Sequence, residues 1–169
     1  IPLRLVGSEM CIRDRFGRSR TKFLGRTSMG AIEDRKLISF KPQTFMNESG
    51  RAVREASNFY KISPERIIVF HDELDLPFGE VRVKKGGSDA GHNGLKSIDE
   101  NIGKDYFRIR IGISHPGDKD KVTSHVLGDL SKEDTETLDK ILSLIAKNIP
   151  ILIDGDEKKF QKNITPSKK

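Results

Sequence analysis

The sequence is poor in the residues that stabilise small secreted proteins and in those that build membrane spans. Its 169 residues include one cysteine, Cys11, and no tryptophan. A single thiol cannot form an internal disulfide, which excludes a disulfide-stapled fold. No apolar run approaches the roughly 20 residues that a membrane-spanning helix needs, and the first residues lack the apolar core of a secretory signal. We therefore expect a cytoplasmic protein that does not enter a membrane.

Histidines are also scarce, and none precedes His71. The four histidines match no common zinc-ligand spacing, and the lone cysteine adds little to them. The chain has neither the G-x-x-x-x-G-K-[ST] phosphate loop nor the G-x-S-x-G nucleophile elbow. We therefore expect no metal and no covalent catalysis by serine. The histidines are His71, His92, His115 and His125.

Acidic residues are outnumbered, with 25 against 31 basic ones, which leaves a net charge of +6. That balance favours a polyanionic partner such as nucleic acid. A length of 169 residues is typical of a single domain with one compact core. Within that length, a group of basic residues lies close in sequence to the first two histidines. The basic group comprises Arg82, Lys84, Lys85, Lys96, Arg108 and Arg110.

Short apolar runs and helical periodicity alternate along the first half of the chain. Residues 37–40 predict a strand, and residues 50–60 predict a helix that Asn47 or Ser49 could cap. The stretch "RIIVF" at 66–70 is apolar from Ile67 onward, which indicates a strand buried on both faces. His71 and Asp72 stand at the end of that strand.

The second half continues the alternation of strands and helices. Residues 80–85 and 107–113 alternate apolar and basic side chains, which predicts two strands with one basic face. A glycine-rich loop between them leads into a helix, and a long helix starts at a capping Ser131. We expect the last dozen residues to be frayed. This order predicts an α/β fold with functional groups where strands end and helices begin.

Two groups of polar residues could carry chemistry, and each has a plainer alternative. Asp72 can orient an imidazole from elsewhere in the chain, or it can simply be solvated with His71 in a loop. The loop "GGSDAGHNG" can bring backbone N–H groups to an anion, or it can be a flexible connection in which Asn93 caps the next helix. Both pairs of alternatives stay open at this point.

Three blocks of sequence together resemble the bacterial peptidyl-tRNA hydrolase family, in the family's order and spacing. They are "KPQTFMNESGRAV", "HDELDLPFGEVRVKKGGSDAGHNGLKSI" and "FRIRIGISHPGDKDKVTSHVL". The resemblance runs from Lys22 to Phe160. It implies a single-domain three-layer α/β sandwich with a twisted mixed sheet flanked by helices. It also implies a monomer that uses no cofactor or metal and hydrolyses the ester between a peptide and the terminal ribose of tRNA, which recycles tRNA during translation.

The resemblance also implies roles for particular residues. Asp72 matches the carboxylate that orients the catalytic histidine, and His92 lines the cleft. Other residues match positions that contact the peptide or the acceptor stem of tRNA. These substrate-contacting residues are Phe45, Asn47, Asn93, Lys84, Arg110 and Lys119.

The N-terminal segment departs from the family pattern. The family begins with a G-L-G-N-P-G loop and then T-R-H-N, whose histidine activates water, whereas residues 1–36 contain no histidine. We expect residues 1–21 to be non-native, residues 22–160 to form the hydrolase-like domain without its native start, and residues 161–169 to be a basic flexible tail. The chain is then an impaired hydrolase, and the alternative is a noncatalytic RNA-binding module.

Overall fold

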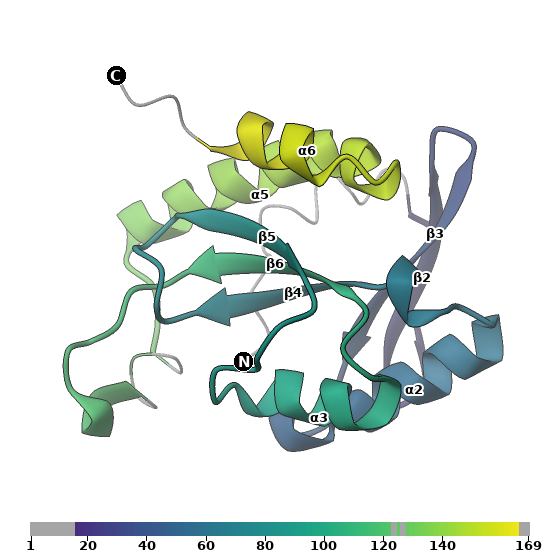
Figure 1. Cartoon of the computed structure of the whole chain (residues 1–169), viewed down its shortest axis with the longest axis horizontal. Helices are drawn as coiled ribbons and strands as arrows, with labels where there is room; N and C mark the ends of the chain where they lie inside the picture. Colours follow the sequence, from purple (N-terminus) through teal and green to yellow (C-terminus); the bar gives the residue numbers. More distant parts are fainter. Residues whose placement is uncertain (1–15, 123–124, 126–127, 166–169) are drawn as a thin grey trace. The chain divides into compact units, whose positions relative to one another are not determined.

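The computed structural model describes residues 16–122, 125 and 128–165 (Figure 1). Its contacts divide the chain into two compact units. The first unit contains Phe70–Lys84 and the described part of Arg108–Lys169, and the second contains Lys85–Phe107 and the described part of Arg13–Val69. Among the described residues, every helix is too short or too polar to cross a membrane.

An antiparallel three-stranded sheet opens the second unit. Strands β1 (Arg20–Lys22), β2 (Gly25–Ile32) and β3 (Arg35–Pro42) follow one another in that order. The register pairs Lys22 with Gly25 and Ile32 with Arg35, so each connection is a turn of two residues. The strand expected at residues 37–40 is therefore confirmed, and it is longer at both ends.

The turn between β1 and β2 places bulky residues where glycine or asparagine is usual. Phe23 and Leu24 have φ angles of 55° and 58°, which cost strain for residues with a Cβ atom. An aromatic cluster offsets part of this cost, because the Phe23 ring lies 5.0 Å from that of Phe59 and 5.5 Å from that of Tyr60. The ammonium of Lys22 lies 3.8 Å from the centre of the Phe59 ring.

Helices α2 (Ser49–Tyr60) and α3 (Asn93–Ile102) lie side by side in the second unit (Figure 1). Their backbones meet at Gly50, where an added Cβ atom would overlap the carbonyl of Ser97. The Gly50 N–H also donates to the Ser97 hydroxyl at 3.0 Å. Glycine is required here because any side chain would force the two helices apart.

A second sheet has the strand order β4–β6–β5, with β4 at Ile68–Glu73, β5 at Val81–Lys85 and β6 at Phe107–Gly112. Phe107 N–H donates to Ile67 O and Ile113 N–H donates to Glu73 O, so β4 and β6 run parallel. Gly112 N–H donates to Glu80 O, and Gly79 N–H donates to Gly112 O, which pairs β5 antiparallel to β6. The expected α/β class with a mixed sheet is confirmed.

Two helices complete the first unit, α5 (Lys132–Ile153) and α6 (Glu157–Ile164). The Ser131 hydroxyl accepts the Asp134 N–H at 3.0 Å, as the sequence predicts for an N-cap. The side chain of Gln161 accepts the Val83 N–H at 2.8 Å and donates to Val81 O at 2.9 Å. This amide satisfies backbone groups along β5, an edge strand that would otherwise expose them.

Three expectations are corrected. The last dozen residues are not frayed as far as they are described, because helix α6 includes residues 158–164 and buries Phe160 and Ile164. Residues 166–169 lie outside the described part. The strand after residue 66 is not buried on both faces, since Phe70 is 38% exposed. Arg108 does not join an exposed basic face, since it is 2% exposed.

The expected domain boundary at residue 22 falls inside β1. Phe16 bridges to Gly30, and the Gly17 N–H donates to Met29 O at 2.8 Å, so this part of the segment is integrated into the first sheet. Residues 1–15 lie outside the described part of the chain. That residues 1–21 are non-native stays a prediction.

Replacing Gly50 by alanine should destabilise the protein. Forcing a methyl group against the Ser97 carbonyl costs about 1–3 kcal/mol, which exceeds the gain of up to about 1 kcal/mol from the higher helix propensity of alanine. We expect urea denaturation to show a lower free energy of unfolding. Gly17→Ala is the matched control, because its Cβ would lie an ordinary 3.5 Å from Met29 O. Equal stabilities for the two variants would contradict the close approach.

Candidate functional site

The first candidate segment lies between β3 and α2. Phe45 is 81% exposed and precedes a single turn of 3-10 helix, η1 (Met46–Glu48), which contains the exposed Asn47. No side chain caps α2, whose N-cap residue is Glu48. The structural alternative for Asn47 and Ser49, that one of them caps this helix, is therefore wrong. The Ser49 hydroxyl instead lies 3.9 Å from the Met46 sulfur.

The second candidate segment is the start of α3, and it contacts the first. His92 is the N-cap residue, and the exposed Asn93 is the first residue of the helix. A Cβ atom on Gly94 would lie 2.5 Å from the Met46 sulfur and 3.0 Å from Cε1 of His92. Gly94 is thus the position at which η1 and the His92 ring approach the helix. The structure brings the T-F-M-N and G-H-N-G segments together within one unit.

The His92 ring, rather than Asn93, caps α3. Its Nδ1 accepts the N–H groups of Gly94 at 3.1 Å and of Leu95 at 3.3 Å. The alternative that Asn93 is the cap is therefore wrong. The N–H groups of Gly94 and Leu95 are therefore already engaged by the imidazole and are not available to an anion. That other backbone N–H groups of the loop and the helix start meet an anion stays a prediction. An Nδ1 atom that accepts hydrogen bonds carries no proton, so the neutral ring carries its proton on Nε2.

The glycine-rich loop before α3 has a defined conformation. Gly86, Gly87 and Gly91 have φ angles of 65°, 104° and 80°, which favour glycine. Asp89 organises the end of the loop, since its carboxylate accepts the Gly91 N–H at 2.8 Å and its carbonyl accepts the His92 N–H at 2.9 Å. The loop therefore sets the position of the His92 ring.

The third candidate pair, His71 and Asp72, lies on β4 in the first unit. His71 is 6% exposed, and its Nδ1 donates to the backbone carbonyl of Asp72 at 2.8 Å. This bond engages the carbonyl of Asp72 and not its carboxylate. Asp72 is half-buried. The carboxylate that follows, Glu73, is 8% exposed and bonds to Arg110, a contact that the sequence analysis did not anticipate.

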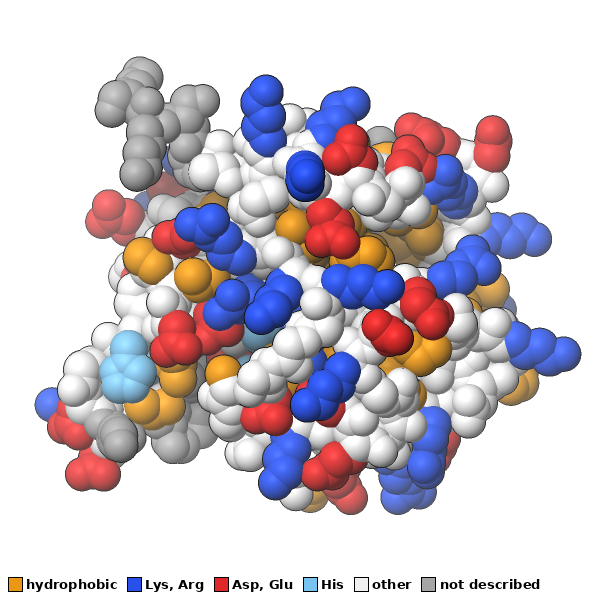
Figure 2. Space-filling view, viewed as in Figure 1, with side chains coloured by type: hydrophobic (Ala, Val, Ile, Leu, Met, Phe, Trp, Pro, Cys, Tyr) orange, Lys and Arg blue, Asp and Glu red, His pale blue; other side chains and the backbone are white. Residues whose placement is uncertain are grey.

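The candidate cations belong to the first unit. Lys84 on β5 is exposed, and within the described part of the chain it has no ion-pair partner. Arg110 on β6 is partly buried. Lys119 begins the short helix η3 (Lys119–Lys121), but its side chain lies outside the described residues. On the face drawn in Figure 2, Lys and Arg side chains are interspersed with Asp and Glu side chains.

The predicted residues are divided between the two units. Phe45, Asn47, His92 and Asn93 belong to the second, and Asp72, Lys84 and Arg110 belong to the first. Sequence reasoning missed Met46, Gly94 and Glu73 as residues that position these groups. A glycine two places after His92 and an acidic residue two places after His71 were the available signals.

No group of three or more His, Cys, Asp or Glu side chains in the described residues could hold a metal ion. His115 accepts the Gly117 N–H at 3.0 Å, and His125 donates to Ile113 O at 2.8 Å. With His71 and His92, each of the four imidazoles therefore bonds to nearby backbone.

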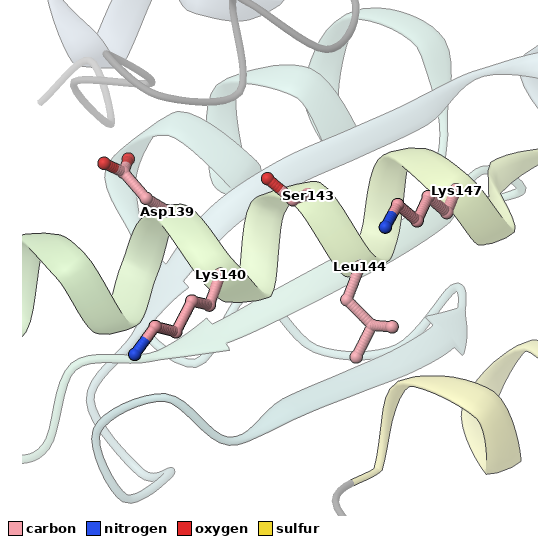
Figure 3. A pocket seen from close by; sticks show the side chains of 5 residues that line it. All are labelled: Asp139, Lys140, Ser143, Leu144 and Lys147. Atoms are coloured by element: carbon pink, nitrogen blue, oxygen red, sulfur yellow. The ribbon is translucent and has the colours of Figure 1, made fainter.

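A surface hollow of about 450 Å³ lies on α5 (Figure 3). Its five lining residues all come from that helix, and they supply two lysines, one carboxylate, one hydroxyl and one leucine. Such a hollow on one side of a single helix does not enclose a ligand. It shares no residue with the candidate segments. The lining residues are Asp139, Lys140, Ser143, Leu144 and Lys147.

The family profile and the similar proteins all carry the same description. The profile described as "Peptidyl-tRNA hydrolase" matches residues 8–169. A protein of that name from Rhodospirillum centenum is 48% identical over 149 residues, which cover 88% of this chain and 66% of that protein. A namesake from Chelativorans sp. is 56% identical over 139 residues, which cover 82% of this chain and 58% of that protein. The chain thus spans less than two thirds of the length of these two relatives.

A solved structure is also similar. The crystal structure of peptidyl-tRNA hydrolase from Acinetobacter baumannii superposes with a TM-score of 0.87 at 34% sequence identity. The match covers 95% of this chain and 83% of that chain.

The cap made by His92 predicts one tautomer and one order of stabilities. At alkaline pH, nitrogen NMR of the labelled protein should show His92 protonated at Nε2. His92→Ala should lower the free energy of unfolding by about 1 kcal/mol, whereas His92→Asn should lower it less, because asparagine is a good N-cap.

The control for this prediction is His115→Ala, which removes an exposed backbone contact that caps no helix. We expect that variant to stay within about 0.5 kcal/mol of the parent. An Nδ1-protonated His92, or equal losses for the alanine and asparagine variants at position 92, would show that the ring does not cap α3.

Proposed function

Because the chain belongs to the peptidyl-tRNA hydrolase family, we propose that it hydrolyses the ester bond between a peptide and the terminal ribose of tRNA. The observation that carries the proposal is the profile match over residues 8–169. The contact between η1 and the start of α3 supports it, because the two segments that resemble substrate-contacting motifs meet there. The protein would act as a cytoplasmic monomer during translation.

The two asparagines are the proposed polar contacts of the substrate. Asn47 and Asn93 are both exposed, and neither amide is used as a helix cap. An exposed amide at a helix start can donate to a peptide carbonyl or hold a water molecule. Phe45, 81% exposed beside Asn47, offers an apolar surface to the peptide.

His92 is proposed as a hydrogen-bond donor and not as the base. A general base needs a lone pair that can take a proton from water. In His92 the lone pair of Nδ1 accepts from two backbone N–H groups, and Nε2 carries the proton. Taking a second proton would convert Nδ1 from an acceptor to a donor and break the cap of α3.

The base is proposed to be a histidine on an N-terminal segment of the family type, oriented by the carboxylate of Asp72. No histidine precedes His71 in this sequence, so the 169-residue chain by itself is expected to hydrolyse peptidyl-tRNA slowly. The test compares this chain with one carrying a T-R-H-N segment in the release of an N-blocked amino acid from tRNA. Equal rates in the two chains would sink this assignment of the base.

Removing either asparagine should slow hydrolysis without unfolding the protein. In a chain that carries the family-type start, we expect Asn47→Ala and Asn93→Ala each to lower the single-turnover rate by roughly 10²- to 10³-fold, the usual cost of losing a positioned donor. Asn101→Ala is the control, since that amide donates to Ser97 O within α3. Full rates for both site variants would remove the asparagines from the proposed site.

Lys84 is proposed to contact an RNA phosphate, together with Arg110 and Lys119. Removing one cation that binds a phosphate should reduce the slope of log affinity against log salt by roughly one unit. We therefore expect Lys84→Ala to bind deacylated tRNA more weakly and with a smaller slope. Lys36→Ala, which removes an exposed lysine of β3, should leave the slope unchanged. The same decrease in both variants would indicate nonspecific attraction.

A further inference from the structure

A buried carboxylate holds one side of the Arg110 guanidinium. Arg110 Nε donates to Oε2 of Glu73 at 2.9 Å, where the side chain of Glu73 is 9% exposed and that of Arg110 is 26% exposed. The other carboxylate oxygen, Oε1, accepts the Asp75 N–H at 3.2 Å. Both oxygens of Glu73 are therefore engaged, and the carboxylate cannot rotate without losing a bond.

The same contact leaves most of the guanidinium unused. Arginine has five N–H donors, and Nε supplies only one of them. Within the described part of the chain, the Nη1 and Nη2 atoms of Arg110 have no hydrogen-bond partner. The group thus combines a fixed Nε with four remaining donors in a planar fork, on a side chain that solvent reaches.

We infer that Glu73 is a positioning residue, whose carboxylate fixes the guanidinium of Arg110 so that its two terminal nitrogens bind one RNA phosphate. The inference rests on the proposed function, which supplies the RNA. A planar guanidinium binds phosphate through two parallel N–H bonds, and such pairing depends on orientation more than a point charge does. Fixing that orientation before binding removes an entropy cost of ordering the side chain.

The competing explanation is that the Glu73–Arg110 ion pair only stabilises the fold. The two explanations predict opposite changes in tRNA affinity when the charge of Glu73 is removed. Neutralising a carboxylate on a basic protein raises its general attraction for a polyanion. If Glu73 only stabilises the fold, its neutral variant should therefore bind tRNA equally well or better. If Glu73 positions Arg110, the variant should bind more weakly, although the protein has become more positive.

The chain offers a matched control in a second Glu–Arg pair. Glu80 bonds to Arg82 on β5, and the Nε–Oε1 distance is 2.7 Å. Their side chains are 34% and 54% exposed, so water screens this pair and the arginine is not fixed in a partly buried setting. Glu80→Gln removes the same charge as Glu73→Gln without releasing Arg110.

The experiment measures affinity for deacylated tRNA against salt concentration. We expect Glu73→Gln to weaken binding on the order of tenfold, the size of one charge-assisted hydrogen bond, and to reduce the salt slope. Glu80→Gln should bind equally well or slightly better. The double variant Glu73→Gln with Arg110→Ala should bind no more weakly than Arg110→Ala alone, because both changes remove the same phosphate interaction.

Arg110→Lys keeps the experiment informative if the glutamine variant unfolds. Lysine keeps the positive charge but has neither an Nε–H nor a planar fork. We expect this variant to keep its thermal stability, as followed by circular dichroism, and to lose affinity by a similar factor. Unchanged or tighter binding by Glu73→Gln, or wild-type affinity of Arg110→Lys, would overturn the inference.

The outcomes distinguish this inference from the proposed function. If Lys84→Ala and Arg110→Ala both leave the salt slope unchanged, the proposed RNA contacts themselves are wrong. If Arg110→Ala lowers the slope and Glu73→Gln does not, Arg110 binds RNA without needing Glu73, and only the positioning role fails.

Discussion

The close approach of α2 and α3 at Gly50 is the constraint on which the second unit depends. Because the Gly50 N–H bonds to the Ser97 hydroxyl, the first turn of α2 is fixed against α3. Asn47 lies three residues before Gly50, and Asn93 lies four residues before Ser97. The starts of α2 and α3, about 46 residues apart in sequence, therefore lie next to each other. They contact at Gly94, where the absence of a side chain leaves room for the Met46 sulfur. Two glycines, which carry no chemistry themselves, allow the polar segments to meet.

The second constraint is the use of imidazole as a backbone partner. A histidine that caps a helix through Nδ1 is a hydrogen-bond donor at Nε2 and cannot take a proton without losing the cap. His71 has the opposite arrangement, since its Nδ1 donates to a carbonyl. Neighbouring backbone groups therefore determine which nitrogen of each ring carries the proton. A histidine count alone does not identify a catalytic base.

Sequence patterns predicted the elements better than their roles. The spacing of apolar residues along an element shows which of its faces is buried. That spacing predicted the helices α2, α3 and α5 and the strands β5 and β6 from the sequence alone. The His92 cap is not visible, because asparagine is the more usual cap and the choice depends on the loop that Asp89 organises. Helix α6 was missed for a similar reason. It buries Phe160 and Ile164, and its Gln161 bonds to β5 across 78 to 80 residues of sequence, so its contacts are not local.

The basic side chains show why charge must be located and not only counted. Arg108 and Arg110 share the alternation that predicts a basic face, yet one is 2% exposed while the side chain of the other is 26% exposed. A buried arginine cannot reach a phosphate. A partly buried arginine can, and its attraction to the phosphate is stronger because the local dielectric constant is lower than that of water. Lys84 is exposed, and within the described part of the chain no acidic side chain pairs with its ammonium. Of these three cations, Arg110 alone combines solvent access with a fixed geometry, and Glu73 provides that geometry.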